Sequence, residues 1–85
     1  MSKIGTIVDV RTHAEYSGGH VAGSVNIPLQ EITAHIEEIR AMEQPIVFCC
    51  ASGNRSGQAT QYFQSIGVEC ENGGSWMDLN YQINI

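Results

Sequence analysis

The stretch from Ile46 to Gly57 constrains the fold of this 85-residue chain more than any other. It reads I-V-F-C-C-A-S-G-N-R-S-G, so a run of apolar residues leads through two adjacent cysteines into a short loop of small residues. A helical pattern follows at once, with apolar residues at i, i+3, i+4 and i+7, namely Ala59, Tyr62, Phe63 and Ile66. Gly67 then occupies the position of a C-terminal cap. The stretch therefore predicts a buried strand, a loop, and a helix that packs an aromatic face inward.

A cysteine at the end of a strand, before a short loop and a helix, lies where backbone N–H groups converge. A free thiol with a pKa of about 8.5 is only slightly ionised at neutral pH, so a nucleophilic cysteine needs such donors. Around Cys50 we expect them from the loop amides, the helix dipole and the guanidinium of Arg55. Gly53 allows backbone angles that are closed to residues with a Cβ. We therefore predict a reactive thiolate at Cys50; the alternative is a structural cysteine on an ordinary strand.

The segment from Cys50 to Ser56 resembles the active-site loop of the rhodanese (sulfurtransferase) family. Upstream, D-V-R, E-Y, G-H-V and G-S-V-N-I-P, at positions 9–28, resemble the first signature of that family. Downstream, G-G-S-W at positions 73–76 resembles its closing motif, one or two residues shorter. The resemblance implies that Cys50 is catalytic and that the substrate is bound by the rest of the loop, namely Arg55, Ala51, Ser52, Gly53, Asn54 and Ser56.

The resemblance also implies a reaction. A sulfane sulfur would pass from thiosulfate or a similar donor to cyanide or a thiol through a persulfide on Cys50, with no metal or organic cofactor. A sulfur-carrier protein is a further candidate partner. Many loops of the family carry a second cation directly after the cysteine, where this chain has Ala51. We therefore expect weak binding of thiosulfate.

Two other functions are compatible with parts of the sequence. Counted from Cys49, the loop reads C-x5-R-S, the spacing of cysteine-dependent phosphatases and arsenate reductases. Phe48 and Ser52 stand where those loops usually carry His and Gly, which favours the count from Cys50. Side chains alternate along a strand, so Cys49 is then expected to face away and to be structural. The third possibility, a non-catalytic rhodanese-like binding module, commonly lacks the cysteine.

The remaining segments alternate between strands and helices. The patterns predict strands at 6–10, 25–27 and 68–70, a short helix capped by Thr12 and Glu15, one helix over Leu29–Met42, and a turn at 72–74. Trp76 is expected to cap the core. This alternation predicts an α/β fold with a small parallel sheet flanked by helices on both faces. Since eight residues precede Asp9, we expect the family's usual N-terminal strand and helix to be lacking and one face of the core to be thin.

Four other polar or thiol residues are expected to be structural. The resemblance implies that Asp9 and Arg11 form an ion pair at a strand end. His20 has no second metal ligand at a suitable spacing, so its ring is expected to bond nearby backbone. Cys70 is expected to be a small buried apolar residue.

Composition limits the remaining possibilities. Residues 1–85 are expected to form a single domain, with 42% hydrophobic and 15% charged residues. A net charge of −5 argues against nucleic acid or an anionic membrane as partner. Three cysteines without a C-x-x-C pair indicate neither a disulfide framework nor a zinc site. We find no transmembrane or signal segment and expect a cytoplasmic monomer, or a periplasmic one if a signal peptide has been removed.

Overall fold

The structure of the protein is a computed structural model that describes residues 3–85. These residues form four strands, β1 (Thr6–Asp9), β2 (Val25–Asn26), β3 (Ile46–Cys50) and β4 (Cys70–Ser75). They also form α1 (His13–Ser17), the 3-10 helix η1 (Leu29–His35), α2 (Ile36–Ala41), α3 (Asn54–Ser65) and α4 (Trp76–Ile83). Within this part of the chain, no helix has the length and apolar character needed to cross a membrane.

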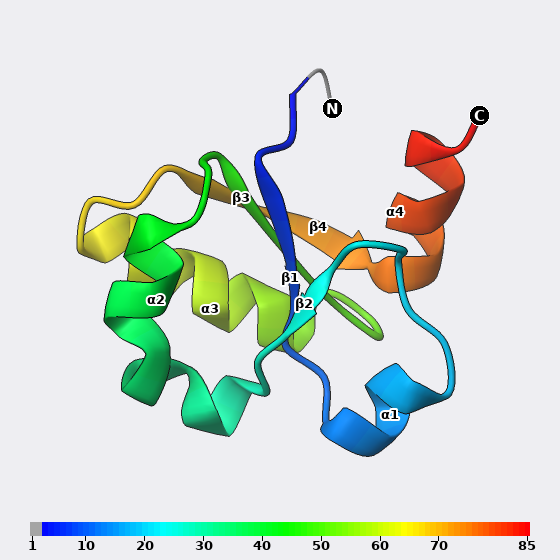
Figure 1. Cartoon of the computed structure of the whole chain (residues 1–85), viewed down its shortest axis with the longest axis horizontal. Helices are drawn as coiled ribbons and strands as arrows, with labels where there is room; N and C mark the ends of the chain where they lie inside the picture. Colours follow the sequence, from blue (N-terminus) through cyan, green and yellow to red (C-terminus); the bar gives the residue numbers. More distant parts are fainter. Residues whose placement is uncertain (1–2) are drawn as a thin grey trace.

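The four strands form one parallel sheet in the order β2-β1-β3-β4, which confirms the predicted fold class (Figure 1). Because all strands run in the same direction, their carboxyl ends lie along one edge of the sheet, called the carboxyl edge below. The chain passes outward from β1 to β2 and then returns to place β3 on the other side of β1. Parallel α/β sheets bind ligands outside the strand ends at such a reversal. The topology therefore predicts a ligand site near the carboxyl ends of β1 and β3.

Side chains alternate along β3 and divide between two cores of unequal size. Phe48 and Cys50 point into the larger core, which η1, α2 and α3 close with four buried residues, Ile32, Ile39, Ala59 and Phe63. Val47 and Cys49 point to the other face, where Leu79 of α4 covers them. Partly buried Ile4, Ile7 and Trp76 complete this smaller core. Figure 1 shows α4 apart from α2 and α3, on the opposite side of the sheet, so the face expected to be thin is the one under α4.

The predicted single helix over Leu29–Met42 is divided in two. A 3-10 helix runs to His35, whose backbone (φ −121°, ψ 22°) interrupts the helical run, and α2 begins at the next residue. A 3-10 helix has about three residues per turn, so apolar spacings of three and four residues fit either helix type. Ile32 and Ile39 still reach the same core, one from each part.

The last strand is longer than predicted, and the turn predicted at Asn72–Gly74 is wrong. β4 begins at Cys70, runs through these residues and pairs with β3 with one irregularity of register. A Cβ on Gly73 would lie 2.7 Å from Cγ1 of Val47 and 3.3 Å from Cδ2 of Leu79. Glycine in a strand often marks such a close approach. Because Gly73 has no side chain, β4 can pack closely against β3 and α4 at this point. Local turn preferences do not reveal such a contact.

The ends of α1 and α3 agree with the sequence patterns. Thr12 and Glu15 form the predicted capping box, in which each side chain accepts a hydrogen bond from the backbone of the other residue. Gly67 follows the last turn of α3 with φ +87°. Phe63 is buried and stacks on Phe48 with ring centroids 5.4 Å apart, whereas Tyr62 is 37% exposed. The aromatic face of α3 is therefore buried through Phe63, with Tyr62 at its margin.

Candidate active site

Cys50 is the last residue of β3, and a three-residue loop connects it to α3. Gly53 is the N-cap of α3 and has φ +101°, in the left-handed region that favours glycine. This conformation turns the first N–H groups of α3 back toward the end of β3. The predicted sequence of strand, loop and helix is thus confirmed.

The sulfur of Cys50 faces these N–H groups. The N–H of Gly53 donates to Sγ at 3.0 Å and the N–H of Ser56 at 3.4 Å, and Oγ of Ser56 lies 3.3 Å from Sγ. Burial of the thiol raises its pKa, but hydrogen bonds from the Ser56 hydroxyl and from the N–H groups of Ser56, Gly53 and Ser52 outweigh this effect. The pKa of Cys50 consequently lies below the ordinary thiol value. The loop therefore stabilises an anionic sulfur, mainly through neutral hydrogen-bond donors.

The sulfur of Cys50 is buried, although the loop that follows it is exposed. Cys50 is 0% exposed, whereas Ala51 and Ser52, which follow it, lie on the surface. Because the side chain is fully buried, a donor molecule can reach Sγ only after a local movement of the protein. Loops with few buried contacts are the segments that open at low free energy.

Asn72, on β4, holds the loop in place, a role that the sequence did not predict. Its Nδ2 donates to the carbonyl of Gly53 at 3.0 Å, and its Oδ1 accepts from the Ser56 hydroxyl at 2.6 Å and from the N–H of Gly74 at 2.9 Å. A hydroxyl has one proton. When Cys50 is a thiolate, the Ser56 hydroxyl can donate to Sγ only if it gives up its hydrogen bond to Asn72. When Cys50 is a neutral thiol, its S–H can instead donate to Oγ of Ser56, which keeps the bond to Asn72. Asn72 is 16 residues from Ser56, so only the sheet brings them together.

The geometry does not favour Cys49 as the nucleophile. Cys49 is 0% exposed in the smaller core, on the face of the sheet opposite to Cys50. Burial, followed by the negative charge of Asp9, raises the pKa of Cys49 to about 12. A thiol in these surroundings stays protonated near neutral pH and is turned away from the loop amides. Among residues 3–85, no N–H group donates to Sγ of Cys49, so the C-x5-R-S spacing does not correspond to an anion-binding loop around this thiol.

Arg55 lies at the start of α3, as predicted, but both of its Nη atoms bind Glu15. Nη1 donates to Oε1 at 2.8 Å and Nη2 to Oε2 at 3.0 Å, across a separation of 40 residues. This bidentate pair joins α1, which follows β1, to the first turn of α3, which follows β3. Of the other predicted site residues, the structure brings the backbone N–H groups of Ser52, Gly53 and Ser56 close to Cys50. Ala51 and Asn54 lie on the exposed side of the loop.

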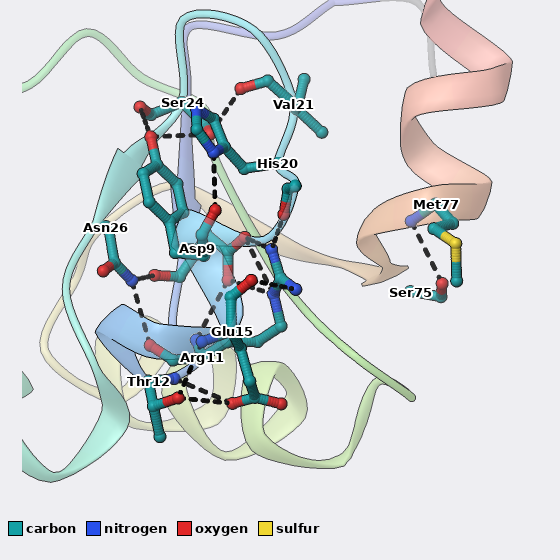
Figure 2. Close-up of polar contacts among 12 residues, drawn as sticks. Asp9, Arg11, Thr12, Glu15, His20, Val21, Ser24, Asn26, Ser75 and Met77 are labelled. Atoms are coloured by element: carbon teal, nitrogen blue, oxygen red, sulfur yellow. Dashed lines mark hydrogen bonds and ion pairs between the residues drawn. The ribbon is translucent and has the colours of Figure 1, made fainter.

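A buried ion pair supports the carboxyl edge at the end of β1 (Figure 2). Asp9 is 0% and Arg11 4% exposed, and Nη2 of Arg11 lies 2.7 Å from Oδ2 of Asp9. The same Nη2 donates to the carbonyl of Gly19 at 2.7 Å, and the guanidinium lies 4.8 Å from the ring centroid of Trp76. These contacts bind β1, the loop after α1 and the start of α4 together. The pair predicted from the sequence is present, and its contacts are structural ones.

The histidines provide no metal site in the described residues. Nδ1 of His20 lies 2.7 Å from the carbonyl of Tyr16, and the two rings stack with centroids 3.8 Å apart. His20 therefore bonds nearby backbone, as predicted. Across residues 3–85, His, Cys, Asp and Glu side chains form no group of three or more that could hold a metal ion.

The three cysteines should differ sharply in reactivity. At neutral pH, iodoacetamide should modify Cys50 before Cys49 and Cys70, because hydrogen bonds lower the pKa of Cys50 whereas burial raises the other two. The rate at Cys50 should fall as the pH drops through a midpoint below that of an unstructured cysteine peptide. Peptide mass mapping measures the order, and the protein in denaturant, where the three thiols should react alike, is the control. Modification of Cys49 first would contradict the assignment.

Comparison with known proteins identifies the family of the chain. The family model of the Rhodanese-like domain matches residues 1–78. The chain is 38% identical over 61 residues to YqhL, an uncharacterised protein of Bacillus subtilis, covering 72% of this chain and 48% of that protein. It is 32% identical over 74 residues to the thiosulfate sulfurtransferase PspE of Escherichia coli, covering 85% and 71% of the two chains.

A solved structure shows the same fold. A rhodanese-related protein from Thermoplasma volcanium has a TM-score of 0.78 at 28% identity, covering 91% of this chain and 77% of that one. The chain thus spans about half the length of one curated relative and most of another. The family match over residues 1–78 and the identity to PspE together show that this chain belongs to the Rhodanese-like domain family.

Proposed function

We propose that the protein is a sulfurtransferase that moves a sulfane sulfur from thiosulfate or a similar donor to cyanide or a thiol through a persulfide on Cys50. The observation that carries the proposal is the position of Sγ, which faces the N–H groups of Gly53 and Ser56 at 3.0 and 3.4 Å. The family membership, and a relative of the same family named as a thiosulfate sulfurtransferase, support this class of reaction.

In the first half-reaction the Cys50 thiolate attacks the outer sulfur of the donor. With thiosulfate, the new Sγ–S bond forms as the S–S bond of the donor breaks, and sulfite leaves with the electron pair of that bond. Cys50 then carries a persulfide anion, and the total charge is unchanged. The lowered pKa of Cys50 serves this step because the thiolate is the nucleophile.

In the second half-reaction an acceptor attacks the outer sulfur of the persulfide. Cyanide forms a C–S bond, leaves as thiocyanate and returns the Cys50 thiolate; a thiol, as its thiolate, leaves instead as a new persulfide. The N–H groups over residues 51–56 stabilise the negative charge in both states. Preorganised hydrogen-bond donors of this kind typically lower the activation free energy by about 3 to 4 kcal/mol each.

We assign the substrate-binding role mainly to the backbone of the loop, at Ala51, Ser52, Gly53, Asn54 and Ser56. The guanidinium of Arg55 contributes its charge at the head of α3 while bound to Glu15. We further propose that the protein acts as a monomer, because the N–H groups of Gly53 and Ser56 that face Sγ belong to the same chain as Cys50. Because Ala51 and Ser52 are exposed, we also propose a sulfur-carrier protein as a partner beside small thiols.

The test is the intact mass of the protein after incubation with thiosulfate and removal of excess donor. The folded protein should gain the mass of one sulfur atom, and peptide mapping should place it on Cys50. The matched variant Cys49→Ala should gain the same mass, since Cys49 faces the smaller core. Cyanide should then remove the added sulfur and release thiocyanate.

Two other outcomes would each favour another function. Hydrolysis of an aryl phosphate that is lost in Cys49→Ala would indicate the phosphatase chemistry. A folded protein that gains no sulfur from any donor would indicate the non-catalytic binding module.

A further inference from the structure

The ion pair between Glu15 and Arg55 bridges the two strand ends at which the sheet reverses its order. Glu15 belongs to α1, which follows β1, and Arg55 belongs to the first turn of α3, which follows β3. The two planar groups meet in a bidentate arrangement, with N–O distances of 2.8 and 3.0 Å. This geometry is the one in which a guanidinium also binds the oxygens of a sulfonate or phosphate. Glu15 therefore occupies both Nη atoms of Arg55, which could otherwise bind an oxyanion.

The Glu15 carboxylate is also held by Thr12 (Figure 2). Its Oε1 accepts hydrogen bonds from the N–H of Thr12 at 2.9 Å and from the Thr12 hydroxyl at 3.1 Å, as part of the capping box of α1. The bonds from Arg55 and from the backbone of Thr12 hold the pKa of Glu15 at about 2. The carboxylate is thus ionised at any working pH and is tied to α1. A donor must compete with an internal anion that is already in place.

Within residues 3–85, each of the other lysine and arginine side chains is either close to a carboxylate or at the opposite edge of the sheet. The chain has four lysines and arginines, Lys3, Arg11, Arg40 and Arg55. Arg11 is buried against Asp9, and Arg40, on α2, lies 3.9 Å from Glu37. Lys3 precedes the amino end of β1, at the edge of the sheet opposite to Cys50. The loop amides are therefore the donors that remain for the substrate, and they suit one anionic sulfur better than a dianion with a bulky sulfonate.

We propose that Glu15 is a specificity-determining residue, which occupies Arg55 and so makes the Cys50 loop prefer sulfane donors without a sulfonate, namely alkyl persulfides, over thiosulfate. This inference rests on the sulfurtransferase function proposed above and names its substrate class. The Cys50 thiolate attacks the outer sulfur of R–S–S–H, the S–S bond of the donor breaks, and R–S⁻ leaves with its electron pair. Cys50 keeps the sulfur with its proton, so atoms and charge balance.

The experiment compares two donors on variants of the full chain. The rate constant for adding one sulfur to Cys50 is measured by intact mass, with thiosulfate and with 2-hydroxyethyl persulfide, which has no sulfonate. Glu15→Gln removes the charge that holds Arg55, and glutamine still serves in a capping box. The double variant Glu15→Gln/Arg55→Gln removes the freed guanidinium as well. Thr12→Ala is the matched control, since it weakens the cap and leaves the Glu15–Arg55 pair intact.

The expected result is a change in donor preference. Glu15→Gln should raise the rate constant with thiosulfate roughly three- to tenfold, the size of effect expected for one freed guanidinium at a partly exposed site. The rate with the alkyl persulfide should stay within about twofold, because that donor has no group for Arg55. The gain with thiosulfate should disappear in the double variant and shrink at high salt, which screens the freed charge.

Other results would overturn the inference. If Glu15→Gln and Thr12→Ala both lower the rate constants with the two donors to the same extent, then Glu15 acts only through the helix cap, by supporting the fold of the loop. If the gain with thiosulfate persists in the double variant, Arg55 is not its source. These outcomes leave the proposed function standing, because sulfur still reaches Cys50. If neither donor adds sulfur to Cys50 in the folded unmodified protein, the proposed function itself fails.

Discussion

Replacing Cys50 by serine should lower kcat/KM for sulfur transfer from thiosulfate to cyanide by at least about a thousandfold. Serine has almost the same shape, so the loop amides should keep their positions. Its hydroxyl does not ionise near neutral pH, and oxygen does not form the persulfide on which the second half-reaction depends. Formation of thiocyanate, followed by its coloured complex with iron, measures the loss.

The neighbouring cysteine provides the control for this prediction. Cys49→Ala should keep kcat/KM within about threefold, since the side chain lies in the smaller core, on the face of the sheet opposite to Cys50. Thermal unfolding of both variants separates a loss of chemistry from a loss of fold. Turnover that survives in Cys50→Ser and disappears in folded Cys49→Ala would reverse the assignment of the nucleophile.

Replacing Asp9 by asparagine should lower the free energy of unfolding by about 3–5 kcal/mol. Arg11 is 4% exposed and donates through Nε and Nη2 to the carboxylate of Asp9, so the change leaves a buried guanidinium without its counter-charge. The loss is a large fraction of the roughly 5–15 kcal/mol that holds a typical domain together. Urea unfolding followed by circular dichroism measures it.

An exposed pair in the same protein is the reference for this prediction. Glu37→Gln breaks the contact to Arg40, where the glutamate side chain is 92% exposed, and should change the free energy of unfolding by less than about 1 kcal/mol. Similar effects of Asp9→Asn and Glu37→Gln would mean that the Arg11 guanidinium is far better solvated than its burial indicates.

Local sequence was enough to predict most of the fold. The apolar run at Ile46–Cys50 required a buried strand, and the period of two along it placed Cys49 and Cys50 on opposite faces. Thr12 and Glu15, three residues apart, predicted the start of α1 because a capping box is a local structure. Gly53 indicated that the loop could take backbone angles closed to residues with a Cβ, and it has φ +101° at the head of α3.

Where two local interpretations had similar merit, the sequence did not decide between them. The apolar spacing over residues 29–42 fits a 3-10 helix followed by an α-helix as well as a single α-helix. Asn72–Gly74 has the composition of a turn, yet these residues belong to β4, where Gly73 lies close to Val47 of β3 and Leu79 of α4. Tertiary packing overrides local preference at both places.

The sequence by itself determined the strand, the loop and the nucleophile candidate, since these depend on residues that are neighbours in the chain. Only the tertiary structure decided what surrounds that nucleophile. Asn72 reaches the loop from β4, and Glu15 takes both Nη atoms of Arg55 across 40 residues. Both contacts depend on the order of strands in the sheet, which brings distant segments to one edge and which no local spacing encodes.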